Sequence, residues 1–233
     1  MSNIGLKICG MNENTAEVAA LRPDYLGFIF YEKSPRNYTA ERIFYPPGAS
    51  QNVGVFVDAS EAFILEKIKR FNLQVVQLHG DESPYNCASL KNAISLEAQR
   101  SSDAHPNQGV HNIKDTDIWK VFSVKDSFDF SVVKAYEPFV DAFLFDTKGA
   151  AKGGNGITFN WEILKEYPSK KPFVLSGGIG LEEVSEIKKL IQSNIPLMAV
   201  DVNSKFEDAP GLKNIQKLKK FKEELATIIE PNK

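Results

Sequence analysis

The sequence predicts an α/β fold in which eight short strands alternate with helices along one chain of 233 residues. Short runs of β-branched or aromatic residues recur along the chain, and amphipathic stretches with helical spacing separate them. Several of these runs are apolar throughout, as in strands that are covered on both faces of a parallel sheet. Such an alternation over about 200–250 residues is typical of a (β/α)8 barrel. We therefore expect a single barrel domain over residues 1–233.

A doubly wound open sheet is the structural alternative. It is disfavoured because the glycine-rich turn late in the chain has no dinucleotide-binding counterpart after the first strand.

The first expected strand, at residues 6–9, carries the residues that matter most for chemistry. Lys7 and Cys9 point to one side of it and Leu6 and Ile8 to the other, because side chains alternate along a strand. A lysine and a cysteine on an inward face are unusual in a plain core. The alternative is that Cys9 is a small buried hydrophobic residue, the commoner role of a single cysteine.

The remaining elements follow in order. Strands are expected at residues 25–30, 52–57, 74–78, 118–123, 141–146, 172–176 and 197–201. Helices are expected at 13–21, at 61–71, from Ser83 and Pro84, from 160 or 161, at 181–190 and along a final stripe from Leu212 to Ile228. Cys87 should pack inside the helix that begins near Ser83. The polar link at 31–38 should be a loop because it contains Pro35.

Two segments depart from this alternation. Residues 92–117 lose clear periodicity and collect Ser, Asp, Asn, His and Gln, so we expect an insertion or long loop there. Residues 147–156 contain four glycines and no apolar residue larger than alanine, which predicts a mobile lid after the sixth strand.

Composition narrows the partners and the compartment. The net charge is −2 and the isoelectric point about 6.0, so no general attraction to nucleic acid or to a membrane is expected. We find neither a secretory leader nor an apolar run of about 18 residues that could span a membrane. Two cysteines are too few for a disulfide scaffold and have no histidines at zinc-ligand spacing. A cytoplasmic protein without a metal site fits best.

Candidate functional residues fall at the carboxyl ends of the expected strands, where barrels place their active sites. They are Cys9, Arg36, Asp146 and the turns at 177–180 and 201–204. Bare backbone N–H groups in the turn at 177–180 can hold a phosphate at a helix N-terminus. In barrels the turn after the eighth strand often completes such a site. The predicted phosphate-binding residues are Gly177, Gly178, Asp201, Asn203 and Ser204.

Each candidate also has a purely structural interpretation. Asp146 could cap the loop that follows it, and Arg36 could be a solvated loop charge. His79, just after the fourth strand, could be a satisfied structural histidine. Glycine-rich turns are common, so the turn at 177–180 is weak evidence by itself.

Six groups of residues share one order along the chain. They are Lys7-Ile-Cys-Gly10, Ser34-Pro-Arg36, Val76-Gln-Leu-His-Gly80, Leu144-Phe-Asp146 with Gly153-Gly-Asn-Gly156, Leu175-Ser-Gly-Gly-Ile179 and Val200-Asp-Val-Asn-Ser204. Together they resemble the phosphoribosylanthranilate isomerase family, from about residue 6 to residue 213 apart from 92–117. The chain departs from the family where Asn203-Ser-Lys205 replaces two serines and a glycine, and at Asn155 and Asn160.

The resemblance implies an enzyme of tryptophan biosynthesis. It would convert N-(5-phosphoribosyl)anthranilate into 1-(o-carboxyphenylamino)-1-deoxyribulose 5-phosphate by an Amadori rearrangement. The resemblance also implies Cys9 as the general base, Asp146 as the general acid and Arg36 as the partner of the anthranilate carboxylate. Three further residues are expected to line the site: Lys7, Gln77 and His79.

A carboxylic acid and a thiolate can together perform this chemistry, so no metal or organic cofactor is expected. The expected partner is a small phosphoribosyl substrate, bound by a monomer or a homodimer. Because the base must be a thiolate, we expect the ammonium of Lys7 to bring the pKa of Cys9 below that of a free thiol.

Two other functions remain open. A related phosphate-binding barrel enzyme of histidine or tryptophan biosynthesis would use two aspartates, or a lysine and a glutamate, which fits Cys9 and Asp146 less well. A non-catalytic barrel that binds a sugar phosphate would need the phosphate turns without the acid–base pair.

Overall fold

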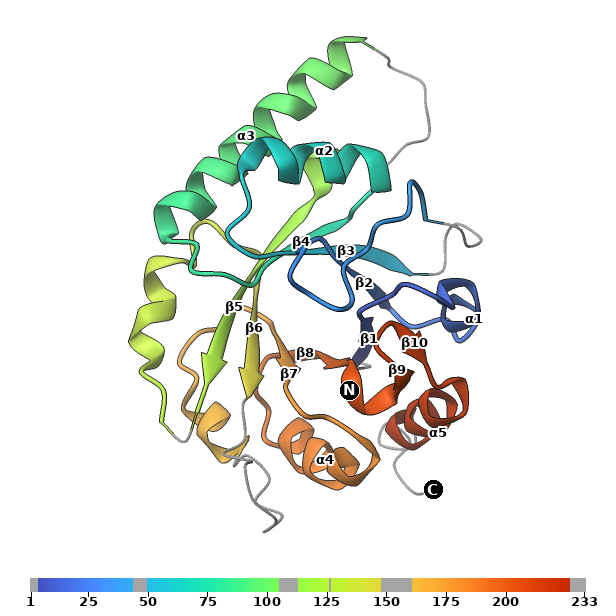
Figure 1. Ribbon diagram of the computed structural model, residues 1–233. Helices are drawn as coiled ribbons and strands as arrows, with labels where there is room; N and C mark the ends of the chain where they lie inside the picture. Colours follow the sequence, from blue (N-terminus) through green and yellow to red (C-terminus); the bar gives the residue numbers. More distant parts are fainter. Residues whose placement is uncertain (1–3, 44–49, 105–112, 126, 148–160, 227–233) are drawn as a thin grey trace.

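Eight parallel strands close into a barrel in which each strand pairs with its neighbours in the sequence (Figure 1). The structure is a computed structural model, and it describes residues 4–43, 50–104, 113–125, 127–147 and 161–226. The strands are β1 Gly5–Cys9, β2 Tyr25–Ile29, β3 Gln51–Phe56, β4 Val75–Leu78, β5 Asp117–Val124, β6 Ala142–Thr147, β7 Phe173–Ser176 and β8 Leu197–Val202. Pairing of β1 with both β2 and β8 closes the ring. The predicted (β/α)8 barrel is confirmed.

Helices lie around the outside of this barrel (Figure 1). The α-helices are α1 Thr15–Ala19, α2 Glu61–Phe71, α3 Pro84–Ala104, α4 Val184–Gln192 and α5 Ile215–Ala226. Short 3-10 segments are η1 Ile113–Asp115, η2 Phe130–Ala135, η3 Trp161–Glu166, η4 Leu181–Glu183 and η5 Ser204–Phe206. Beyond β8, the strands β9 Glu207–Ala209 and β10 Leu212–Lys213 form a small antiparallel pair.

Three of the expected strand–helix units are less regular than the sequence predicts. The described residues between β2 and β3 contain no helix, and η2 and η3 take the place of α-helices after β5 and β6. Pro138 and Pro168 follow η2 and η3 within a few residues. A proline disfavours helical backbone in the residue before it, so these segments end after a single short stretch.

Of the insertion or long loop predicted near residues 92–117, the loop is wrong over most of its length. Residues 92–104 belong to α3, 113–115 form η1, and β5 begins at Asp117, while 105–112 lie outside the described residues. Leu90, Ile94 and Ala98 are buried along one face of α3 at helical spacing. The polar residues between them face outward and hide this stripe in the sequence.

The final helix begins later than predicted. Leu212 lies in β10, and α5 starts at Ile215, where the side chain of Asn214 accepts a hydrogen bond from the backbone N–H of Lys217 at 2.9 Å. This N-cap fixes the start of the helix.

Two apolar layers hold the barrel together. Leu6 and Ile8 belong to the outer layer between strands and helices. Cys9, Val53 and Leu144 belong to the smaller layer that fills the interior. The alternation predicted for the first strand is therefore confirmed.

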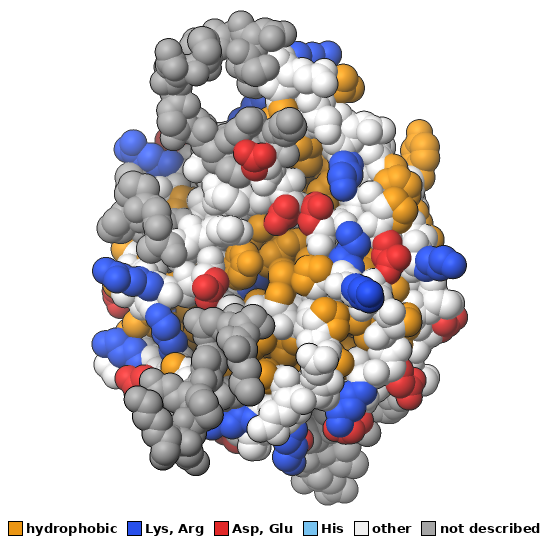
Figure 2. Space-filling view, turned by 180° about the vertical axis from the view of Figure 1, so that it is seen from behind, with side chains coloured by type: hydrophobic (Ala, Val, Ile, Leu, Met, Phe, Trp, Pro, Cys, Tyr) orange, Lys and Arg blue, Asp and Glu red, His pale blue; other side chains and the backbone are white. Residues whose placement is uncertain are grey.

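Charged side chains of both signs are interspersed on the surface, around apolar side chains near the centre of the face in Figure 2. This distribution agrees with the net charge of −2. Among the described residues, no helix has the length and apolar character needed to cross a membrane.

Candidate active site

Lys7 and Cys9 lie on the inner side of β1, next to a glycine of the neighbouring strand. The side chain of Cys9, the last residue of β1, is 5% exposed, and that of Lys7 is fully buried. A Cβ atom on Gly27 of β2 would lie 2.8 Å from Cys9 Sγ and 3.1 Å from Lys7 Nζ. The glycine therefore leaves the space in which the thiol and the ammonium meet.

A buried ion pair joins the first and last strands of the barrel. Lys7 Nζ lies 3.0 Å from Asp201 Oδ1, at an angle outside hydrogen-bond geometry, and the register of β1 on β8 sets these residues opposite one another. Burial disfavours the ammonium, but the attraction of Asp201 and Cys9 outweighs it and raises the pKa of Lys7. Burial also raises the pKa of Asp201, against the pull of Lys7. The Asp201 carboxylate thus faces Lys7 inside the barrel, and the structure does not support its predicted contact with phosphate.

Opposing effects act on the pKa of the Cys9 thiol. Burial raises its pKa, and the nearby carboxylate of Asp201 raises it further, whereas Lys7 and Lys213 lower it. Burial is the largest of these effects, so the pKa of Cys9 is above its ordinary value. The expectation of a pKa below that of a free thiol is therefore wrong, although Lys7 acts in the predicted direction.

Asp146 lies near the carboxyl end of β6 and is close to the histidine that follows β4. His79 Nε2 is 3.8 Å from Asp146 Oδ2, and His79 Nδ1 is 3.1 Å from Gln77 Nε2. Gln77 is buried inside the barrel, so it can fix the orientation of the imidazole. Asp201 is within electrostatic reach of both His79 and Asp146. Gln77 of β4 and His79 directly after it, both predicted to line the site, therefore lie on the side of the predicted general acid.

Arg36 is held by Glu207, which in turn is bound by Lys213, and the sequence analysis predicted no role for either residue. Its Nε lies 2.9 Å from each carboxylate oxygen of Glu207, and its Nη2 lies 2.6 Å from Glu207 Oε2. Lys213 Nζ donates to Glu207 Oε1 at 2.6 Å from the other side. The signal that could have pointed to them is their position in the polar segment directly after the eighth strand, at the functional end of the barrel.

Gly10 brings this cluster next to Cys9. Its φ of +75° favours glycine, and a Cβ there would lie 2.8 Å from Arg36 Cδ, 2.8 Å from Asn203 Oδ1 and 3.4 Å from Lys213 Nζ. Asn203 Oδ1 accepts a hydrogen bond from Lys213 at 2.7 Å. Asn203 was predicted as a phosphate-binding residue, and in the structure its side-chain oxygen is bound by Lys213 beside Cys9.

The two predicted phosphate turns contact one another. Gly177 and Gly178 have φ values of +100° and +65°, and no heavy atom lies within 4 Å of a Cβ built on Gly178, so the backbone there is open. A Cβ on Gly180 would lie 2.7 Å from Lys205 Cδ, next to Ser204 in the other turn. The backbone N–H of Gly180 donates a hydrogen bond to Glu183 Oε2 at 2.7 Å.

Glu183 in turn forms an ion pair with Lys205 at 2.8 Å. Lys205 thus offsets the charge of the Glu183 carboxylate at this turn.

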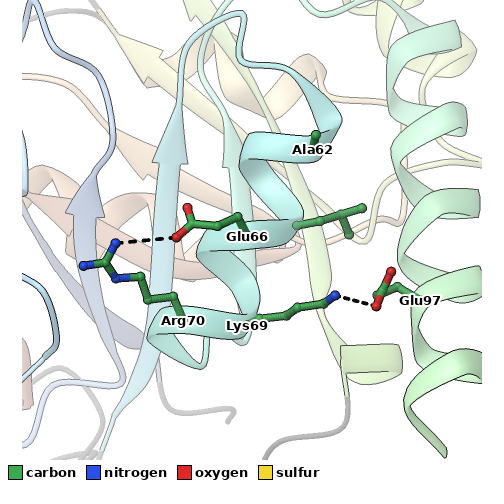
Figure 3. A pocket seen from close by; sticks show the side chains of 6 residues that line it. Ala62, Glu66, Lys69, Arg70 and Glu97 are labelled. Carbon is green, nitrogen blue, oxygen red and sulfur yellow. Dashed lines mark hydrogen bonds and ion pairs between the residues drawn. The ribbon is translucent and has the colours of Figure 1, made fainter. Parts of the chain in front are cut away.

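A separate hollow of about 560 Å³ lies outside the barrel between α2 and α3 (Figure 3). Its charged side chains are paired: Lys69 of α2 with Glu97 of α3 across the hollow, and Arg70 with Glu66 along α2 at 3.6 Å. Each of these four charged side chains has a partner of opposite sign, so none of them is free to bind a ligand. The Lys69–Glu97 pair joins the two helices.

The second cysteine is unrelated to this site. Cys87 is fully buried in α3, as predicted, and burial raises its pKa to about 11. Both cysteines are free thiols. No group of His, Cys, Asp or Glu side chains within the described part of the chain could hold a metal ion.

The closed parallel barrel, with ionisable side chains gathered at the carboxyl ends of its strands, defines a (β/α)8-barrel enzyme. A family model described as N-(5'phosphoribosyl)anthranilate (PRA) isomerase matches the chain over residues 6–113 and 104–224. The chain belongs to this family. The resemblance of the six groups of residues is therefore confirmed.

Relatives with the same family name match almost the whole chain. The N-(5'-phosphoribosyl)anthranilate isomerase of Parabacteroides distasonis is 38% identical over 226 residues, which cover 93% of this chain and 90% of the relative. That of Campylobacter jejuni is 36% identical over 228 residues, which cover 94% and 98%.

Solved structures agree with the fold. The phosphoribosyl anthranilate isomerase of Thermotoga maritima is 28% identical with a TM-score of 0.71, and the match covers 96% of this chain and 99% of that one. A second structure of such an isomerase, in complex with reduced 1-(o-carboxyphenylamino)-1-deoxyribulose 5-phosphate, is 26% identical with a TM-score of 0.67 over the same shares.

Proposed function

We propose that this chain isomerises N-(5'-phosphoribosyl)anthranilate to 1-(o-carboxyphenylamino)-1-deoxyribulose 5-phosphate in tryptophan biosynthesis, with Cys9 as general base and Asp146 as general acid. Family membership and relatives of 36–38% identity over more than nine-tenths of the chain support the reaction. One observation carries the assignment of the base: the thiol of Cys9 lies at the carboxyl end of β1, within reach of the charges of Lys7, Lys213 and Asp201.

The reaction needs one proton donated and one removed. Asp146 donates a proton to the ring oxygen of the sugar, the bond from that oxygen to C1 breaks, and C1 and the anilino nitrogen form an iminium. This cation acidifies the C–H bond at C2, and the thiolate of Cys9 takes that proton. The resulting enolamine tautomerises to the ketone, so atoms and charge balance without a cofactor. His79, 3.8 Å from Asp146, is suited to orient the acid.

The raised pKa of Cys9 is compatible with this role. Fewer molecules hold the thiolate at neutral pH, but a thiolate of higher pKa is a stronger base. The ammonium groups of Lys7 and Lys213 stabilise the anion once it forms. Burial is the main influence on both thiols, but two cations, Lys7 and Lys213, act on Cys9, whereas one, Lys120, acts on Cys87.

The two ends of the substrate require two anion sites. We assign the anthranilate carboxylate to Arg36. Glu207 is bound through Nε and Nη2 of the guanidinium, so the two Nη1 protons point away from Glu207 and can donate to a ligand. We assign the phosphate to the backbone N–H groups of Gly177 and Gly178, together with Ser204, and a Cβ built on Gly178 has no heavy atom within 4 Å. A lid at 147–156 stays a prediction, because residues 148–156 lie outside the described residues.

Two further proposals concern the compartment and the assembly of the enzyme. We place the enzyme in the cytoplasm, because both of its cysteines are free and a thiolate base requires a reduced thiol. We expect it to act as a monomer or a homodimer on this one small substrate. The Thermotoga maritima relative is described both as dimeric and as generated monomers.

A tryptophan auxotroph that lacks this isomerase tests the proposal, together with turnover of the purified chain. The wild type should restore growth, Cys9→Ala and Asp146→Asn should not, and Cys87→Ala is the matched control because it removes the other buried thiol. Folded wild-type protein that binds a product analogue but has no turnover would favour the non-catalytic sugar-phosphate barrel. Activity in Cys9→Ala would remove the base from this mechanism.

A further inference from the structure

Glu207 holds Arg36 by one edge of the guanidinium. Both of its oxygens lie 2.9 Å from Nε, and Oε2 lies 2.6 Å from Nη2, in the planar geometry that suits a carboxylate and a guanidinium. Glu207 is 4% exposed and Arg36 20% exposed, so solvent screens the contact only weakly. The orientation of the arginine is therefore fixed before any ligand arrives.

This contact creates an electrostatic difficulty for the proposed function. A carboxylate in contact with the guanidinium neutralises most of its positive charge. A neutral pair would attract a second carboxylate, that of the anthranilate ring, only weakly. The same residue that orients Arg36 thus weakens the attraction on which substrate binding depends.

Lys213 supplies the missing charge. Its Nζ lies 2.6 Å from Glu207 Oε1 and 2.7 Å from Asn203 Oδ1, and its side chain is 1% exposed. Pairing of β10 with β9 sets Lys213 opposite Glu207, and Asn14 bonds to both the N–H and the C=O of Lys213 at 2.9 Å. Two cations and one carboxylate give this group a net charge of +1.

The position of the group relates it to the reaction. A Cβ on Gly10, the residue after Cys9, would lie within 3.4 Å of both Arg36 and Lys213. We propose that Glu207 and Lys213 are positioning residues for this reaction: Glu207 fixes the guanidinium of Arg36, and Lys213 restores the positive charge that Glu207 removes from the carboxylate site. The inference rests on the proposed function, because it takes the anthranilate carboxylate as the ligand of Arg36.

Two ligands separate this role from a structural one. The first is reduced 1-(o-carboxyphenylamino)-1-deoxyribulose 5-phosphate, and the second is the same compound without its carboxyl group. Lys213→Met and Lys213→Gln should weaken binding of the first ligand about tenfold, the equivalent of one lost charge-assisted interaction, and change the second less than twofold. The glutamine variant keeps a donor for Glu207, so it serves if the methionine variant does not fold. Lys189→Met, which removes an exposed lysine paired with Glu186, is the control.

A double variant gives the sharpest result. Glu207→Gln combined with Lys213→Met removes one charge of each sign and leaves Arg36 with its full charge. It should bind the carboxylate ligand several-fold more tightly than Lys213→Met alone. If both lysine variants weaken the two ligands equally, or if the double variant binds no better than the single one, the inference is overturned. Failure of the proposed function is seen separately, as a wild type that does not turn over substrate.

Discussion

Replacing Lys7 by methionine should destabilise the folded barrel strongly, because it leaves a carboxylate inside the barrel without its partner. Lys7 and Asp201 are 0% and 6% exposed and lie 3.0 Å apart. Removing one member of such a buried pair costs about 3–5 kcal/mol. With an m-value of about 3 kcal/mol/M, the urea midpoint should fall by about 1–1.7 M.

The pH dependence gives this prediction a second test. Burial already raises the pKa of Asp201 and Lys7 lowers it, so the variant raises that pKa further. A carboxyl whose pKa is higher in the folded state than in the unfolded state loses stability as pH rises through that range. The deficit of Lys7→Met should therefore be full at neutral pH and shrink as pH falls toward the ordinary carboxyl range. Adding Asp201→Asn should recover part of the loss at neutral pH.

Urea unfolding followed by circular dichroism measures these quantities. Lys189→Met is the matched control, because it breaks an exposed pair with Glu186 and should leave the urea midpoint almost unchanged. A loss below about 1 kcal/mol for Lys7→Met, unchanged between neutral and acid pH, would show that the pair does not carry charge in the folded protein.

Further predictions concern the site itself. Arg36→Lys should lower kcat/KM by more than about tenfold, because lysine cannot keep the planar contact with Glu207 and a ligand carboxylate; unchanged kinetics would make Arg36 a plain loop charge. Gly178→Val should abolish binding of inorganic phosphate in calorimetry while the fold survives, because its φ of +65° excludes a branched residue; unaltered affinity would remove this turn from the phosphate site. Cys9 should alkylate with an apparent pKa above that of a free thiol, higher still in Lys7→Met, and a phosphate-bearing product analogue should protect it; a pKa indifferent to Lys7 would contradict the described contacts.

Local geometry explains why several features could be predicted from the sequence. Side chains alternate along any strand, so the inward direction of Lys7 and Cys9 follows from the strand assignment alone. The order of the motifs was enough to indicate the family. The helical stripe of α3 was missed because its outward residues are so polar that the apolar spacing is hard to see. The helix expected from residue 160 or 161 is only the short 3-10 segment η3, because Pro168 follows it.

Only the tertiary structure decided which residues far apart in the chain are in contact. Closure of the barrel pairs β1 with β8, and this alone brings Asp201 to Lys7. Arg36 and Glu207 are 171 positions apart, so no local pattern joins them. The pKa of Cys9 likewise depends on burial and on charges from distant segments. The sequence therefore predicted that Lys7 lowers this pKa, but not that burial outweighs Lys7 and raises it overall. Short stretches of sequence determine local backbone geometry, whereas burial and the contacts between distant charges arise only when the barrel closes.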